Sequence, residues 1–93
     1  MVVSVLSAEF RLPAADTLKE KRQVVQSLLR RTGQRFRLSI AEVGWHDQVD
    51  RLQLGAAVVS TAGVHGERVL QTVLEFIERE YPVELMAAGV EQR

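Results

Sequence analysis

The side chains best suited to chemistry lie in the segment from Gly44 to Asp50, which holds a histidine and two aspartates. An imidazole titrates near neutral pH, so His46 could act as a general base, with Asp47 or Asp50 orienting it. Adjacent side chains on a hairpin often point to opposite sides, so the sequence favours a structural loop here. A small-molecule sensor or minor enzyme, centred on Glu42, His46 and Asp47, is the alternative to a non-enzymatic protein.

Metal and redox chemistry have little support in the composition. The chain has no cysteine, which excludes disulfides, zinc knuckles, iron–sulfur clusters and thiol nucleophiles. Its two histidines and scattered carboxylates do not follow the spacing of metal ligands. We therefore expect no metal and no cofactor.

The sequence predicts no membrane association. No apolar run approaches the roughly 18–20 residues of a membrane span. The first ten residues lack the basic region and the cleavage pattern of a signal peptide. A cytoplasmic location is the resulting expectation.

Positive charge is concentrated between Thr17 and Arg37, although the net charge of the chain is zero. This segment has seven basic residues and one acid, whereas residues 38–93 have four basic and nine acidic residues. Such segregation indicates a contact surface for an anionic partner, and RNA or a ribonucleoprotein is the one we expect. The other interpretation is that these are ordinary solvated charges on an amphipathic helix. The candidate contact residues are Lys19, Arg22, Arg30, Arg31, Arg35 and Arg37.

The elements that must position these side chains begin with four predicted strands. Apolar and polar residues alternate, or an apolar run is bounded by turn residues, which is typical of β-strands. Pro13 ends the first strand because proline cannot donate to a central ladder. The predicted strands cover residues 2–12, 35–44, 51–60 and 83–91.

Two helices are predicted between these strands. Thr17 and Glu20 have the spacing of a capping box, so the first helix begins there. It is expected to run to about Thr32 and to end at Gly33, which can adopt the left-handed conformation. The second helix follows Gly63 and Gly66 and is closed by Pro82. Its apolar face has the spacing i, i+3, i+4, i+7 and i+11 and consists of Leu70, Val73, Leu74, Ile77 and Tyr81.

The order β-α-β-β-α-β is typical of the ferredoxin-like plait, an α+β fold. In this plait, a four-stranded antiparallel sheet carries both helices on one face and leaves the other face bare. Residues 1–93 are expected to form one such domain.

The bare sheet face is predicted to be unusually apolar. A sheet face in contact with water is normally polar. We therefore expect a second copy to cover it in a two-fold homodimer; the other interpretation is a solvated apolar sheet. Because the middle strands offer no aromatic residues for stacking bases, binding of the RNA-recognition-motif type is not expected. The predicted face includes Val3, Val5, Ala57 and Val59, with Met86 and Ala88 or their neighbours on the last strand.

Two opposite charges are predicted on inward faces. Lys21 falls inside the apolar stripe of the first helix, and Glu42 shares the strand parity of Leu38 and Ile40. A lysine in such a stripe must pair, extend to solvent or serve a function. A partly buried Lys21–Glu42 ion pair is the first hypothesis. A local bulge that turns Glu42 outward and a functional site are the alternatives.

Several short motifs resemble those of the YlxP-like family of small bacterial proteins. They are LKEKR at 18–22, AEVG at 41–44 followed by Asp47, LGAAVVS at 54–60 and the closing VELMAAGVE at 83–91. The resemblance covers essentially the whole chain and implies a ferredoxin-like fold. Genes of this family often lie among those for translation initiation and ribosome maturation, which implies a link to translation. Relatives commonly have tryptophan where this chain has Val49, whereas its only tryptophan is Trp45.

Overall fold

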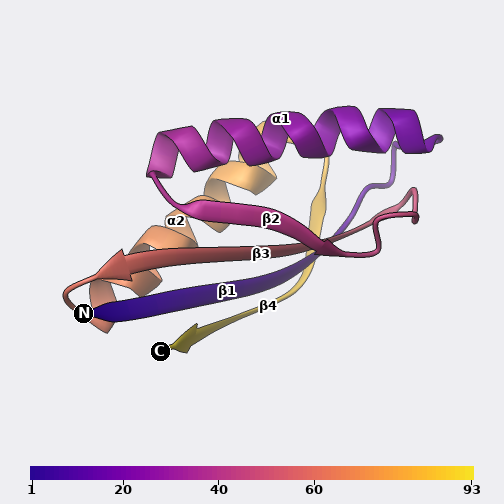
Figure 1. The fold of residues 1–93 in the computed structure, drawn as a ribbon. Helices are drawn as coiled ribbons and strands as arrows, with labels where there is room; N and C mark the ends of the chain where they lie inside the picture. The colour runs from indigo at the N-terminus through magenta and orange to yellow at the C-terminus, as the bar shows by residue number, and fades with distance from the viewer.

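Two helices cover one face of a four-stranded antiparallel sheet, as Figure 1 shows. The computed structural model describes residues 1–93, in the order β1 (Val2–Arg11), α1 (Leu18–Phe36), β2 (Ser39–Gly44), β3 (Arg51–Ser60), α2 (Gly63–Glu80) and β4 (Glu84–Gln92). The strands lie in the order β2-β3-β1-β4, and every neighbouring pair is antiparallel. The predicted ferredoxin-like plait is confirmed.

The core lies between the sheet and the helices. Alternate residues of β1 and β3 point toward the helices, and the register pairs Leu6 with Ala56 and Phe10 with Leu52. Burial of such side chains is the main favourable contribution to folding. The largest apolar side chains of this core include Leu6, Phe10, Leu52, Leu54, Leu70 and Ile77.

Helix α1 begins as predicted but ends later. The Thr17 hydroxyl accepts a hydrogen bond from the backbone N–H of Glu20 at 3.1 Å. The helix then continues through Gly33 to Phe36 and ends where Arg37 adopts a left-handed conformation, with φ at 51°. The expected stop at Gly33 was wrong. Packing of the Phe36 ring edge-on to Phe76, with centroids 5.5 Å apart, favours the additional turn over the cost of a helical glycine.

Strand β2 is correspondingly shorter than predicted. It begins at Ser39, so Phe36 does not belong to its alternating pattern and Arg35 lies in the last turn of α1. Between Glu42 and Gly44 the register with β3 shifts by a β-bulge. The bulge lies after Glu42, which remains paired with the buried Leu54.

Helix α2 approaches β1 closely at one glycine. Gly66 is buried, and a Cβ atom at this position would overlap the Ser4 hydroxyl and lie 2.9 Å from the Ser4 Cβ. Ser4 is also fully buried and donates a hydrogen bond to Gln92 Oε1 at 2.9 Å. A glycine is therefore required here by close packing of the helix on the sheet.

Strand β4 also contains a bulge, opposite Glu9 and Phe10 of β1. The register pairs Ala88 with Ala8, which is on the helix-bearing face, and pairs Ala87 with Glu9 on the bare face. The sequence left open whether Ala88 or a neighbour belongs to the bare face; the register places its neighbour Ala87 there and Ala88 on the other face. Neither helix is long and apolar enough to cross a membrane.

Candidate functional site

The basic residues predicted to contact a partner come mainly from α1. This helix has six basic residues and one acid, whereas α2 has two basic residues and four acids. The α1 acid, Glu20, serves the helix start: its carboxylate accepts hydrogen bonds from the Thr17 hydroxyl at 3.3 Å and from the Asp16 N–H at 3.4 Å. Within the helix itself, little negative charge is therefore available to neutralise these basic residues; the carboxylates that pair with some of them come from other elements.

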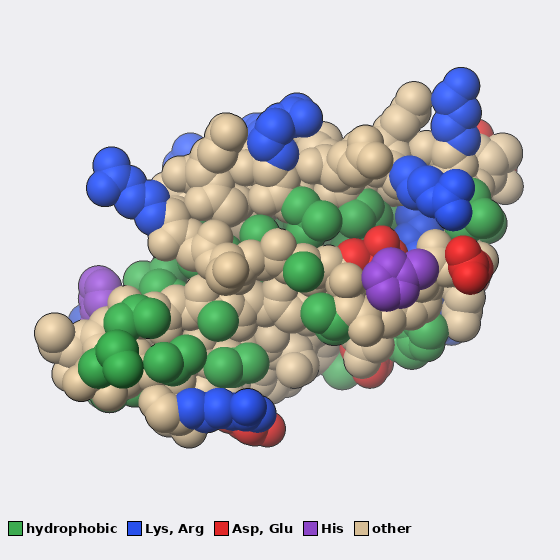
Figure 2. Space-filling view, viewed as in Figure 1, with side chains coloured by type: hydrophobic (Ala, Val, Ile, Leu, Met, Phe, Trp, Pro, Cys, Tyr) green, Lys and Arg blue, Asp and Glu red, His purple; other side chains and the backbone are tan.

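The structure does not gather the six predicted contact residues in one patch. Figure 2 shows the Lys and Arg side chains in separate groups along α1. Helical spacing places Lys19 and Arg30 on the side of α1 opposite its buried residues, and both are exposed without an ion-pair partner. Arg22 is turned toward the loop after β2, where it lies 3.9 Å from the exposed Asp47 carboxylate. Arg37 is exposed at the end of α1.

Arg31 and Arg35 are turned toward α2. Arg31 donates to Glu80 at 3.1 Å and to the Tyr81 hydroxyl at 3.1 Å. The guanidinium of Arg35 lies over the Phe76 ring, 5.1 Å from its centroid, and has no carboxylate within 4.0 Å. These two residues therefore form a second group, separate from Lys19 and Arg30.

Lys21 lies in the interior and has two partners. Its side chain is 1% exposed, and its ammonium lies 3.0 Å from Glu42 Oε2 and donates to the Trp45 carbonyl at 2.6 Å. The same carbonyl accepts the Gln48 N–H at 3.0 Å, and Trp45 itself adopts a left-handed conformation with φ at 57°. The ammonium thus joins α1, β2 and the loop that follows β2.

The residues of the alternative catalytic site do not converge. The Glu42 carboxylate faces Lys21, whereas the His46 ring contacts the Glu42 backbone carbonyl at 3.1 Å. Asp47 is 93% exposed, and its only charged neighbour is Arg22. No group of three or more His, Asp or Glu side chains is arranged to hold a metal ion. Neither Asp47 nor the Glu42 carboxylate is hydrogen-bonded to the His46 ring, so the three residues do not form the predicted arrangement.

The bare sheet face carries an apolar cluster on β1 and β3, with charged residues beside it on β4 and toward the opposite end of the strands. Direct pairing of Val3 with Val59 and of Val5 with Ala57 puts these four predicted side chains together. Val43 joins them, since it lies against Gly55 at the β2 bulge. Hydrophobic side chains gather in Figure 2 over the end of β1 and β3 near the N-terminus. The face is also neutral, with acidic Glu9, Glu84 and Glu91 and basic Arg11, Arg51 and Arg93.

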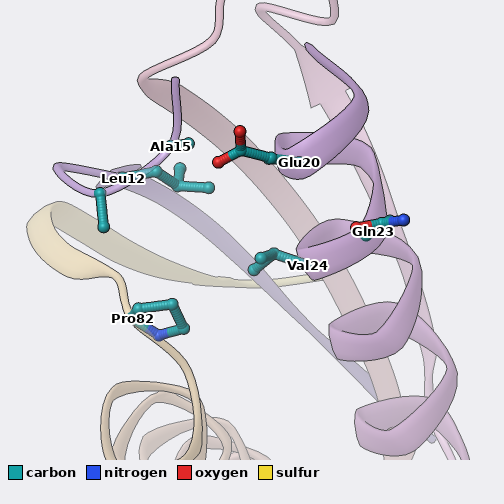
Figure 3. Close-up of a pocket in the computed structure, with 7 residues that line it drawn as sticks. Leu12, Ala15, Glu20, Gln23, Val24 and Pro82 are labelled. Atoms are coloured by element: carbon teal, nitrogen blue, oxygen red, sulfur yellow. The ribbon is translucent and has the colours of Figure 1, made fainter. Parts of the chain in front are cut away.

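A hollow of about 300 Å³ lies between the β1–α1 loop, α1 and the segment before β4. Figure 3 shows Leu12, Val24 and Pro82 around it, with Glu20 and Gln23 at its α1 side. The Glu20 carboxylate forms the polar edge of this hollow. It caps α1 and therefore already has a structural role.

The element order and the β2-β3-β1-β4 sheet define a protein of the ferredoxin-like class. A de novo designed protein with a ferredoxin fold, solved by solution NMR, is similar with a TM-score of 0.55. The alignment covers 100% of this chain and 83% of the designed chain. At 14% identity, this similarity shows the fold alone.

Residues 3–90 match the family model described as "Protein of unknown function (DUF503)". The chain belongs to this family. The "Uncharacterized protein YlxP" of Bacillus subtilis (strain 168) is 44% identical over 64 residues, which cover 69% of this chain and 70% of that protein. The resemblance to the YlxP-like family is thereby confirmed.

The sequence did not single out the α2 residues that meet Arg31 and Arg35. In the sequence, Phe76, Arg79 and Glu80 are distinguishable only as positions of the second helix. One signal was present: Arg31 and Arg35 are one turn apart, as are Phe76 and Glu80, so each pair occupies one side of its helix. The sequence does not show that these sides of the two helices face each other, because this depends on how the helices pack.

Proposed function

We propose that this protein is a non-enzymatic binding module that associates with RNA or a ribonucleoprotein through α1. One observation carries the proposal: α1 presents exposed basic side chains that no carboxylate neutralises. Lys19 and Arg30 have no ion-pair partner and are separated by 11 residues, or about 16 Å along the helix axis. Two exposed cations at this separation can contact different phosphates of one nucleic-acid strand.

The bare sheet face lacks the features that bind RNA, which favours α1 as the binding surface. It is neutral, and its middle strands present no aromatic side chain on this face. Base stacking on aromatic residues is the usual way in which this topology binds RNA. Contacts to backbone phosphates by α1 would therefore dominate, with little sequence preference.

The experiment measures fluorescence anisotropy of a labelled single-stranded RNA at several salt concentrations. Arg30→Glu should weaken binding and lower the slope of log affinity against log salt by about one or more. Arg68→Glu is the matched control, since Arg68 is an exposed helical arginine of α2 without an ion-pair partner. Equal effects of the two variants, or no RNA binding at low salt, would contradict the proposal.

We also propose that two copies associate through the bare sheet face. Four strands about 4.8 Å apart, with up to ten residues rising about 3.4 Å each, span roughly 600 Å². This is of the order of the about 800 Å² that each partner buries in a stable interface. Since the face carries three acids and three bases, a second copy of the same face is not repelled. Light scattering at micromolar concentration tests this: a monomeric mass would overturn it.

A further inference from the structure

A hollow of about 390 Å³ lies where the C-terminal half of α1 meets α2. It is lined by Arg31, Gln34 and Arg35 of α1 and by Phe76 of α2. We propose that this hollow binds a phosphate group and is the point where the protein holds one phosphate of the RNA backbone. The RNA part of this inference rests on the proposed function, whereas the phosphate chemistry stands on the residues themselves.

Three guanidinium groups converge on one aromatic ring. The Cζ atoms of Arg31, Arg35 and Arg79 lie 5.6, 5.1 and 5.9 Å from the centroid of Phe76. Stacking on an aromatic ring fixes the plane of a guanidinium and leaves N–H groups at its edge. Those N–H groups remain able to donate to the oxygens of a phosphate, often two at a time.

The positive charge of this cluster is only partly compensated. Glu80 is its single carboxylate, with Oε1 3.1 Å from Arg31 and Oε2 3.5 Å from Arg79. Arg35 has no carboxylate within 4.0 Å. Three cations and one anion leave an excess of two positive charges beside a hollow, and like charges at short range repel one another. A bound phosphate would remove this repulsion.

Arg31 is held in place before any ligand arrives. Its guanidinium donates to the Tyr81 hydroxyl at 3.1 Å, and that hydroxyl also contacts the Ser27 hydroxyl at 3.2 Å. The hydrogen bond to Glu80, and then the one to Tyr81, raises the pKa of Arg31 above its usual value. An already ordered arginine loses less conformational entropy when it binds, which favours affinity.

Glu80 would compete with a bound phosphate for the arginine N–H groups of this cluster. Its carboxylate uses the same type of donor that a phosphate would use, and it is only partly exposed, at 35%. Removing its charge should therefore strengthen phosphate binding. A purely structural arginine cluster predicts the opposite, since loss of Glu80 would then only loosen α2 against α1.

The test follows the arginine Nε–Hε signals by NMR during titration with two probes, inorganic phosphate and a short oligouridylate. Glu80→Gln should raise the affinity for both probes by about fivefold at low salt, and Arg35→Gln should lower it by about the same factor. The matched controls are Glu78→Gln and Arg68→Gln, which remove the same charges from exposed positions of α2. Because Glu80→Gln predicts a gain, misfolding cannot mimic the expected result.

The outcomes separate this inference from the proposed function. If the oligouridylate binds but neither Arg35→Gln nor Glu80→Gln changes its affinity, the hollow is not the phosphate site and the assignment is overturned. If inorganic phosphate shows the predicted pattern and the oligouridylate does not bind, the phosphate site is supported and the RNA function fails. If neither probe moves the signals of Arg31, Arg35 or Arg79, the inference is overturned.

Discussion

At the scale of single residues, Lys21 shows what spacing alone can predict and what it cannot. Helical periodicity places Lys21 in the buried stripe of α1, and strand parity places Glu42 on the inward face of β2. Both positions follow from local geometry, which the sequence determines. The Trp45 carbonyl could not be predicted as a partner, because it depends on a left-handed tryptophan that no local preference favours.

The Lys21–Glu42 contact leads to a prediction about stability. Glu42→Gln leaves the Lys21 ammonium, 1% exposed, without its counter-charge, so the free energy of unfolding should fall by about 3 kcal/mol. Glu84→Gln removes the same charge from the exposed Arg11–Glu84 pair and should cost less than about 1 kcal/mol. Urea unfolding of the two variants measures both changes. Equal stability of Glu42→Gln and the parent protein would show that the ion pair is not structural.

At the scale of elements, the existence and type of every helix and strand followed from the sequence, but the α1–β2 boundary did not. Gly33 has the local preference of a helix end, and Phe36 has the parity of a strand. What decides the boundary is a contact between distant residues, the packing of Phe36 on Phe76. Tertiary contacts of this kind override local propensities because each propensity is worth about 1 kcal/mol or less.

Two of the helical glycines, Gly33 and Gly66, should respond to alanine in opposite directions. A Cβ at Gly33 would lie 3.5 Å from Ile40 Cγ2, an ordinary contact, so Gly33→Ala should stabilise the protein by about 1 kcal/mol through helix propensity. A Cβ at Gly66 would overlap the buried Ser4, so Gly66→Ala should destabilise it by about 1–3 kcal/mol. Thermal unfolding measures both. A destabilising Gly33→Ala would show that α1 has no room to remain helical beside β2.

At the scale of the whole molecule, the basic residues that are concentrated in the sequence do not form one continuous basic surface. The basic segment becomes one helix whose side chains leave in different directions: Lys19 and Arg30 outward, Arg22 toward the β2–β3 loop, and Arg31 and Arg35 toward α2. A count along the chain could not show this division, because it depends on the packing of α1 against β2 and α2. The bare face, by contrast, could be largely assigned from strand parity.

The proposed dimer can be tested by one matched pair of variants. Val59 on the bare face is 64% exposed and Val64 on α2 is 61% exposed, so glutamate is equally accessible to water at either position in a monomer. In a dimer through the bare face, Val59→Glu would bury a charge among Val3, Val5 and Ala57 and should weaken association by about 100-fold or more. Val64→Glu should leave association unchanged. Sedimentation equilibrium measures the dissociation constants; a dimer equally sensitive to both changes, or to neither, would place the interface elsewhere.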